Sequence, residues 1–169
     1  MGYELKVDGM AEISELLSEM EDRAPAVASK ALYEGAGIMA DEIRKGADSI
    51  RTAPFKWASS TKGDTRLPSP EEKEIVQTAA AGIAKFNKNG TEVDTSVGFR
   101  NAGYAELKGK IVPIPKIVNA INSGTSFMKK QPFVRKAASS ASPKALEAMR
   151  KCIEEEFEAI GKQYKATMK

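Results

Sequence analysis

Apolar residues at helical spacing fill the first quarter of the chain, and this pattern constrains the fold more than any other feature. The residues concerned are Ile13, Leu16, Leu17 and Met20, followed by Val27, Leu32, Ala36, Met39 and Ile43. Because proline lacks a backbone donor and disfavours helical geometry in the residue before it, we expect Pro25 to divide the pattern into two helices. The second helix is expected to end near Lys45. Residues 3–7 alternate apolar and polar side chains and predict a short strand before the first helix.

Two further helices are indicated by their starting residues. Ser69 and Pro70 are followed by Glu72, a combination that satisfies free amides at a helix start and predicts an inserted helix over residues 69–86. Ser142 and Pro143 indicate the start of a last amphipathic helix, with fraying expected over residues 162–169. The apolar stripes are Ile75, Ala79, Ile83 and Phe86 in the inserted helix, and Leu146, Met149, Ile153, Phe157 and Ile160 in the last.

Strand patterns lie between these helices. Residues 91–99 alternate strictly and predict a half-buried antiparallel strand, with Val93, Thr95, Val97 and Phe99 on its inner side. Residues 111–115 are apolar but contain two prolines, which favours an edge strand or an extended segment. Residues 117–121 fit either a strand or a helical turn, closed by Gly124.

These elements predict one α+β domain over residues 1–169. In it, a small antiparallel sheet packs against a long N-terminal helix and a C-terminal amphipathic helix. Residues 47–68 show no sustained period, so we expect a mobile loop there, with Trp57 as an anchor.

The residue types disfavour catalysis. The chain has no histidine and one cysteine, Cys152, which removes the usual general base and the commonest nitrogen ligand of metals. Carboxylate chemistry with magnesium stays open. The Ser-x-x-Lys matches at Ser59 and Ser126 lack the companion motifs of known serine enzymes. We therefore expect no enzyme, no metal and no cofactor. No apolar run approaches the roughly 18 residues that a membrane span needs, so no membrane association is expected.

Positive charge gathers in one segment. Residues 100–136 hold eight basic residues and one acid, Glu106, a net charge of +7, whereas the chain as a whole has +3 and the remainder therefore −4. The basic residues are Arg100, Lys108, Lys110, Lys116, Lys129, Lys130, Arg135 and Lys136. Such a segment can meet phosphate or an acidic protein surface, or form a solvated loop.

Within this segment, residues 121–137 contain a Gly-Thr pair, a short linker, a Pro-Phe pair and an alanine-rich continuation. The matching residues are Gly124, Thr125, Pro132, Phe133 and Ala137. This pattern resembles the signature of the tail-completion proteins, also called neck or minor tail components, of lambda-like phages and prophages. The long helix after a short first strand resembles that family too.

The sequence departs from the family pattern at two places. Ala53-Pro54 is present, but only residues 65–67 echo the Thr-Gly and Leu-Arg pairs that usually follow, and residues 69–86 resemble an insertion. Asn122 and Ser123 replace the acidic and aromatic residues that commonly precede the Gly-Thr pair.

The resemblance implies a non-enzymatic virion component, made in the bacterial cytoplasm, that acts at the head-tail junction or tail end in tail completion and head-tail joining. It implies other tail or head-tail connector proteins as partners, and a ring of copies on assembly. The residues that we expect at the interface are Phe127, Met128, Lys129, Lys130 and Arg135. Phe133 is instead expected in the core, because it follows the proline that starts a helix. The alternative is a nucleic-acid-binding accessory protein that uses residues 100–136.

Overall fold

The computed structural model describes residues 10–53, 65–89, 92–99 and 102–167. Within these ranges it is an α+β protein, which confirms the predicted class. The helices are α1 (Met10–Asp48), α2 (Pro70–Ala79), α3 (Ile114–Ser123) and α4 (Phe133–Thr167). The strands are β1 (Gly82–Ile83), β2 (Asn87–Asn89), β3 (Glu92–Asp94), β4 (Val97–Gly98), β5 (Tyr104–Leu107) and β6 (Lys110–Pro113).

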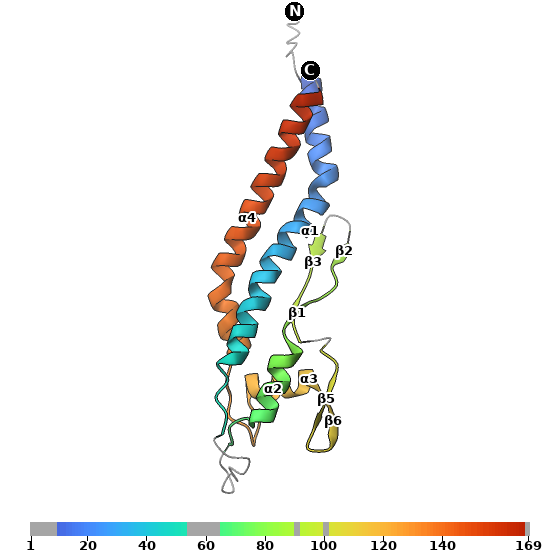
Figure 1. Cartoon of the computed structure of the whole chain (residues 1–169). Coiled ribbons are helices and arrows are strands. Elements are labelled where there is room, and N and C mark those ends of the chain that lie inside the picture. Colours follow the sequence, from blue (N-terminus) through green and yellow to red (C-terminus); the bar gives the residue numbers. More distant parts are fainter. Residues whose placement is uncertain (1–9, 54–64, 90–91, 100–101, 168–169) are drawn as a thin grey trace, which may run out of the picture.

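Helices α1 and α4 form a long antiparallel pair, and the smaller elements pack beside the end of the pair that lies away from the two termini (Figure 1). Small residues let the two helices approach closely. A Cβ added to Gly35 would lie 2.1 Å from Cε of Met149, and one added to Gly46 would lie 3.2 Å from the carbonyl oxygen of Phe133. The buried alanines of this pair are Ala31, Ala36, Ala40 and Ala47 in α1, and Ala137, Ala141 and Ala145 in α4.

Pro25 does not divide the first helix, so the prediction of two helices is wrong. Helix α1 is continuous over 39 residues with Pro25 inside it, and Ser29 Oγ donates a hydrogen bond to the Pro25 carbonyl oxygen at 2.7 Å. An internal proline costs about 3 kcal/mol. Packing against α4 offsets this cost, because the residues that follow, such as Val27 and Ala31, are buried.

The last helix also differs from its prediction. It begins at Phe133 instead of Ser142, passes through Pro143 and continues to Thr167, so the fraying expected from residue 162 is not found up to that residue. Its buried face is set by small side chains and not by the largest ones. Leu146 is 62% exposed and Ile153 37% exposed, whereas Ile160 is buried as expected, Cys152 is buried and Phe157 half-buried.

Helix α2 is shorter than predicted. Its capping box is confirmed, since the Ser69 side chain accepts a hydrogen bond from the Glu72 amide and the Glu72 carboxylate accepts one from the Ser69 amide. The helix stops at Ala79 because the next residue, Ala80, has a positive φ of 49°. Ile83 therefore lies in β1, and Phe86 lies beyond it with its ring beside that of Tyr33.

The strands form three separate two-stranded antiparallel sheets instead of one. The inner and outer sides predicted for residues 92–99 are confirmed, but the strand is interrupted at Thr95 and Ser96, so that β3 pairs with β2 and β4 pairs with β1. Strands β5 and β6 form a hairpin whose turn residues, Lys108 and Gly109, both have the positive φ that a type I′ turn requires.

The core lies where α1, α2, α3 and the start of α4 meet. Its central residues include Ile43, Val76, Ile121 and Phe133, which are at most 5% exposed. Residues 117–121, left open between strand and helical turn, belong to α3, and Gly124 closes that helix as expected. No helix in the described ranges is long and apolar enough to cross a membrane.

Two ends of the segment 47–68 are described. Residues 47 and 48 still belong to α1, and the Ala53 amide donates to the Pro68 carbonyl oxygen at 3.0 Å, so the segment leaves and returns at neighbouring points. Residues 54–64, with the expected anchor Trp57, lie outside the described residues.

Candidate interaction surface

The segment that resembles the phage signature begins at the end of α3. Gly124 has a φ of +77°, and its amide donates to the Ala120 carbonyl oxygen at 3.0 Å. A Cβ at this position would lie 3.0 Å from the Cβ of Lys130 and 3.1 Å from its backbone nitrogen. Both the dihedral angle and the close approach of the following segment therefore favour glycine here.

Thr125 closes a tight turn that points two neighbouring side chains in opposite directions. Its Oγ1 accepts from the Met128 amide at 3.0 Å, and its own amide donates to the Met128 carbonyl oxygen at 3.0 Å. As a result Phe127 is 54% exposed, whereas Met128 is 2% exposed and packs in the core. Met128 is thus a core residue, and the expectation that it anchors an interface is corrected.

Backbone hydrogen bonds of Arg66 connect this turn to the segment before α2. The Arg66 amide donates to the Phe127 carbonyl oxygen at 2.9 Å, and the Lys129 amide donates to the Arg66 carbonyl oxygen at 2.8 Å. The backbone on either side of Phe127 is therefore held by a segment about 60 residues earlier in the chain. An exposed aromatic side chain on a fixed backbone loses little conformational entropy when it binds a partner.

The Arg66 side chain extends the same attachment to α2. Its Nη1 lies 2.7 Å from Oε2 of Glu72 and its Nη2 lies 2.6 Å from Oε1, a bidentate pair with a nearly buried carboxylate. Burial would raise the pKa of Glu72, but the hydrogen bonds from Arg66 and from the Ser69 amide outweigh it, and the pKa is lowered. The pairing of Glu72 with Arg66 had no signal in the sequence.

The C-terminal end of the loop is held by hydrogen bonds of Gln131 and by burial of Phe133. The Gln131 side chain accepts from the Arg51 amide at 2.9 Å and donates to the Arg51 carbonyl oxygen at 2.8 Å. Pro132 then leads into α4, where Phe133 is 5% exposed and stacks edge-on against Phe99 with 6.2 Å between ring centroids. Phe133 is therefore core, as predicted. Ala137, one turn further, is also buried.

Seven of the eight basic residues of segment 100–136 are described, and all seven are exposed; Arg100 lies outside the described residues. Salt bridges elsewhere pair acids with residues such as Arg23, Arg44 and Arg66, but within the described ranges none of these seven has an acid within salt-bridge distance. The seven are Lys108, Lys110, Lys116, Lys129, Lys130, Arg135 and Lys136.

The β5–β6 hairpin adds an exposed apolar face that the sequence reading missed. Tyr104 is 72% exposed and Ile111 is 78% exposed, while Ala105, Leu107 and Val112 on the opposite face pack against the core. The alternation of side-chain types over residues 104–107, followed by Lys108-Gly109, is the sequence pattern that indicates this hairpin. The hairpin and the Phe127 turn both lie toward the end of the molecule away from the termini (Figure 1).

Of the two serine–lysine matches weighed for catalysis, the structure describes only the one at Ser126 and Lys129. Ser126 and Lys129 are both exposed on the Thr125 turn, and Ser59 lies outside the described residues. In the part of the chain that the structure describes, no cluster of three or more acidic or cysteine side chains could hold a metal. Burial, followed by the nearby charge of Glu34, raises the pKa of the Cys152 thiol.

Comparison of the chain with protein-family models, with curated proteins and with solved structures finds no match.

Proposed function

We propose that this chain is a non-enzymatic structural component of a phage or prophage particle, acting at the head-tail junction or tail end in tail completion and head-tail joining. The observation that carries the proposal is the segment from Gly124 to Ala137. Its five signature residues set the loop and the start of α4, and the loop presents Phe127 to solvent.

The surface at this loop combines one exposed aromatic ring with positive charge. Aromatic residues and arginine tend to dominate binding energy, whereas peripheral charges contribute to orientation and association rate. Phe127 is the aromatic candidate, and the exposed basic residues Lys129, Lys130 and Arg135 follow it in the sequence. We propose that these four residues contact a neighbouring tail or head-tail connector protein or a second copy of the chain.

Assembly into a ring follows from the same proposal. A contact between two different surfaces of identical chains is heterologous, and it closes into a ring when the rotation between neighbours divides a full turn. The loop at one end of the long helix pair and a different surface on the neighbour would provide such a contact.

A genetic experiment tests the proposed function. The gene is deleted from the phage or inducible prophage that encodes it, and particles are examined with and without the wild-type chain supplied in trans. The proposal predicts unjoined heads and tails, or tails of defective length, that disappear on complementation. Normal particle yield and infectivity without the gene would contradict it.

The second candidate is a nucleic-acid-binding accessory protein. It is favoured by one observation, the seven exposed basic residues that have no acidic partner within salt-bridge distance in the described ranges. Unneutralised lysine and arginine side chains bind phosphates and release counterions, which makes such binding strongly salt-dependent. A salt titration of binding to labelled DNA distinguishes contact with DNA from contact with an acidic protein surface.

A further inference from the structure

A groove of about 530 Å³ lies between α2 and the strand β5. Helix α2 lines it with Ile75 and Ala79, strand β5 with Tyr104 and Ala105, and helix α3 with Ile114. These side chains are mainly apolar, so a ligand that enters the groove removes apolar surface from water. A cavity of about 150 Å³ already takes up a benzene ring. The groove is therefore large enough for an aromatic side chain and the residues next to it.

Two acidic residues of α2 also line the groove. Glu71, Glu74 and Thr78 are exposed and share one face of the helix, because they are three and four residues apart. In the part of the chain that the structure describes, neither Glu71 nor Glu74 has a basic side chain within salt-bridge distance, whereas Glu72 is paired with Arg66. The groove thus combines apolar walls with two carboxylates that no ion pair neutralises.

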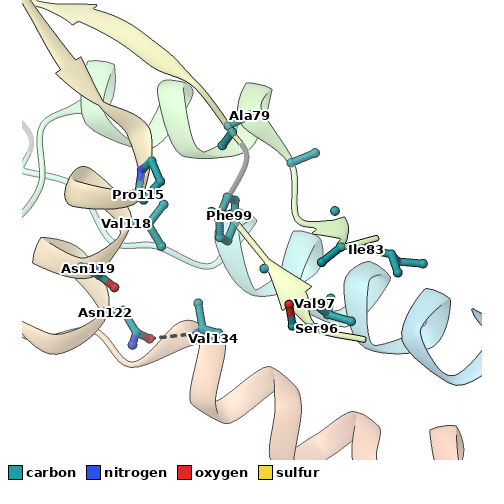
Figure 2. A pocket seen from close by; sticks show the side chains of 15 residues that line it. Ala79, Ile83, Ser96, Val97, Phe99, Pro115, Val118, Asn119, Asn122 and Val134 are labelled. Carbon is teal, nitrogen blue, oxygen red and sulfur yellow. Dashed lines mark hydrogen bonds between the residues drawn. The ribbon is translucent and has the colours of Figure 1, made fainter. Parts of the chain in front are cut away.

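A neighbouring cavity has no such charge. It measures about 480 Å³ and lies between the β1–β4 sheet, α3 and the start of α4 (Figure 2). Ala79 and Ala102 line both the cavity and the groove, so the two are adjacent. None of the described residues around the cavity is charged, and its polar groups include the amides of Asn119 and Asn122. A positively charged ligand is therefore attracted to the groove beside α2 and not to this cavity.

We propose that Phe127 of a second copy of this chain binds in the groove. Lys129 and Lys130 of that copy then face Glu71 and Glu74. In the described ranges the two lysines have no acidic partner and the two glutamates have no basic one, so the charges of the loop and the groove are complementary. The inference rests on the proposed contact of Phe127 with a neighbour, and it names the surface that Phe127 contacts.

The loop that carries Phe127 is already held in one backbone conformation. The Phe127 carbonyl oxygen accepts from the Arg66 amide at 2.9 Å, and the Lys129 amide donates to the Arg66 carbonyl oxygen at 2.8 Å. Insertion of the loop therefore costs little backbone entropy, and it buries a ring that is 54% exposed in the single chain. Tyr104, which is 72% exposed and lines the groove, provides a second ring for an aromatic pair.

The ring in the groove must come from another copy. Phe127 is not among the residues that line the groove of its own chain, and Arg66 fixes its backbone in an exposed position. The loop and the groove are different surfaces of one chain. A contact in which each copy gives its loop to one neighbour and receives the loop of another is heterologous, which is the type of contact that a ring requires.

Exchange of charges between the two surfaces tests the inference with the full-length chain. The loop variant carries Lys129→Glu and Lys130→Glu, and the groove variant carries Glu71→Lys and Glu74→Lys. Each alone should raise the dissociation constant for self-association in sedimentation by about tenfold or more, because like charges now meet. An equal mixture of the two variants should associate as the wild type does, since every loop then finds a groove of opposite charge.

A control variant separates this contact from a general effect of net charge. Glu21→Lys with Asp22→Lys makes the same change of charge as the groove variant, at exposed positions of α1 toward the termini (Figure 1). It should self-associate as the wild type does and should not restore association of the loop variant. Circular dichroism first establishes that each variant is folded.

Carbodiimide cross-linking identifies the contact directly. Isotope-labelled and unlabelled wild-type chains are mixed and cross-linked, and the peptides are analysed by mass spectrometry. The expected amide links join Lys129 or Lys130 of one chain to Glu71 or Glu74 of the other, and Phe127→Ala should lower their yield by about tenfold.

The absence of these links, links confined to single chains, or failure of the mixed charge variants to associate would each overturn the inference. The proposed function has its own test in the gene deletion. Unjoined heads and tails in the deletion, without these links in the purified chain, would support that function and refute the groove as the surface that Phe127 contacts.

Discussion

Arg66 and Glu72 form a bidentate ion pair, with N–O distances of 2.6 and 2.7 Å, next to the turn of residues 125–128. Glu72 is 4% exposed, and its carboxylate also accepts a hydrogen bond from the Ser69 amide. One carboxylate therefore joins three features: the helix start of α2, the segment before it, and, through the Arg66 backbone, the turn that presents Phe127.

Loss of the Glu72 charge should destabilise the fold. Glu72→Gln leaves the guanidinium of Arg66 without its counter-ion, and the free energy of unfolding should fall by about 2–3 kcal/mol, less than for a fully buried pair because Arg66 is partly exposed. Urea unfolding measures this. Glu71→Gln, an exposed neighbour in the same helical turn, is the matched control and should change stability by only a few tenths of a kcal/mol.

The Arg66–Glu72 pair should also make the free energy of unfolding depend on pH. The folded-state pKa of Glu72 lies below the ordinary value of 4.5, so its contribution is complete above that pH and is lost as the pH falls toward the folded-state pKa. The difference in free energy of unfolding between wild type and Glu72→Gln should therefore shrink as the pH falls below 5. A difference that stays constant down to pH 2.5 would show that the carboxylate charge contributes nothing.

Substitution of Gly124 by alanine should lower the stability of the fold, whereas the same substitution at Gly37 should not. Gly124 has a φ of +77°, and a Cβ at this position would lie 3.0 Å from the Cβ of Lys130, so Gly124→Ala should lower the free energy of unfolding by at least about 1–2 kcal/mol. Gly37 is inside α1 with open space at its Cβ position, and Gly37→Ala should raise stability by up to about 1 kcal/mol. Thermal unfolding of the two variants compares them directly; equal melting temperatures would refute the role given to Gly124.

Phe133 and Phe127 should respond differently to truncation. Phe133→Ala removes a core ring and should cost about 3–5 kcal/mol. Phe127→Ala removes an exposed ring and should stay within about 0.5 kcal/mol of wild type. In a complementation assay, Phe127→Ala is nevertheless expected to reduce infectivity. A stable and fully infectious Phe127→Ala chain would show that this residue makes no required contact.

Local signals predicted much of this fold. The capping residues Ser69 and Glu72, the helix end at Gly124 and the core position of Phe133 were each readable, because each depends on neighbouring residues alone. The α+β class followed from the change of apolar period along the chain.

The helix pair was misread because tertiary packing overrides local rules. Pro25 and Pro143 weaken a helix locally, but burial against the partner helix maintains it across both positions. The buried face of α4 follows alanines such as Ala141, which is 0% exposed, and leaves Leu146 outside. Close helix packing requires small residues, and a search for large apolar side chains selects the wrong face. The pairing of Arg66 with the turn is likewise invisible in sequence.

Salt dependence separates the two functional candidates. If the basic residues bind DNA, the affinity for labelled duplex should fall steeply with salt, and the double variant Lys129→Gln, Lys130→Gln should reduce the slope by about two. The proposed structural role instead predicts weak binding with no change of slope. Lys151→Gln with Lys162→Gln, two exposed lysines of α4, is the matched control.

The position of this chain in its particle can be determined by cryo-electron microscopy of the particle whose genome encodes it. We expect density for the chain at the head-tail junction or the tail end, with the Gly124–Phe133 loop at a subunit boundary and Phe127 in contact with a neighbouring protein. Mature particles that contain no copy of the chain, or copies whose Phe127 faces solvent at that position, would contradict it.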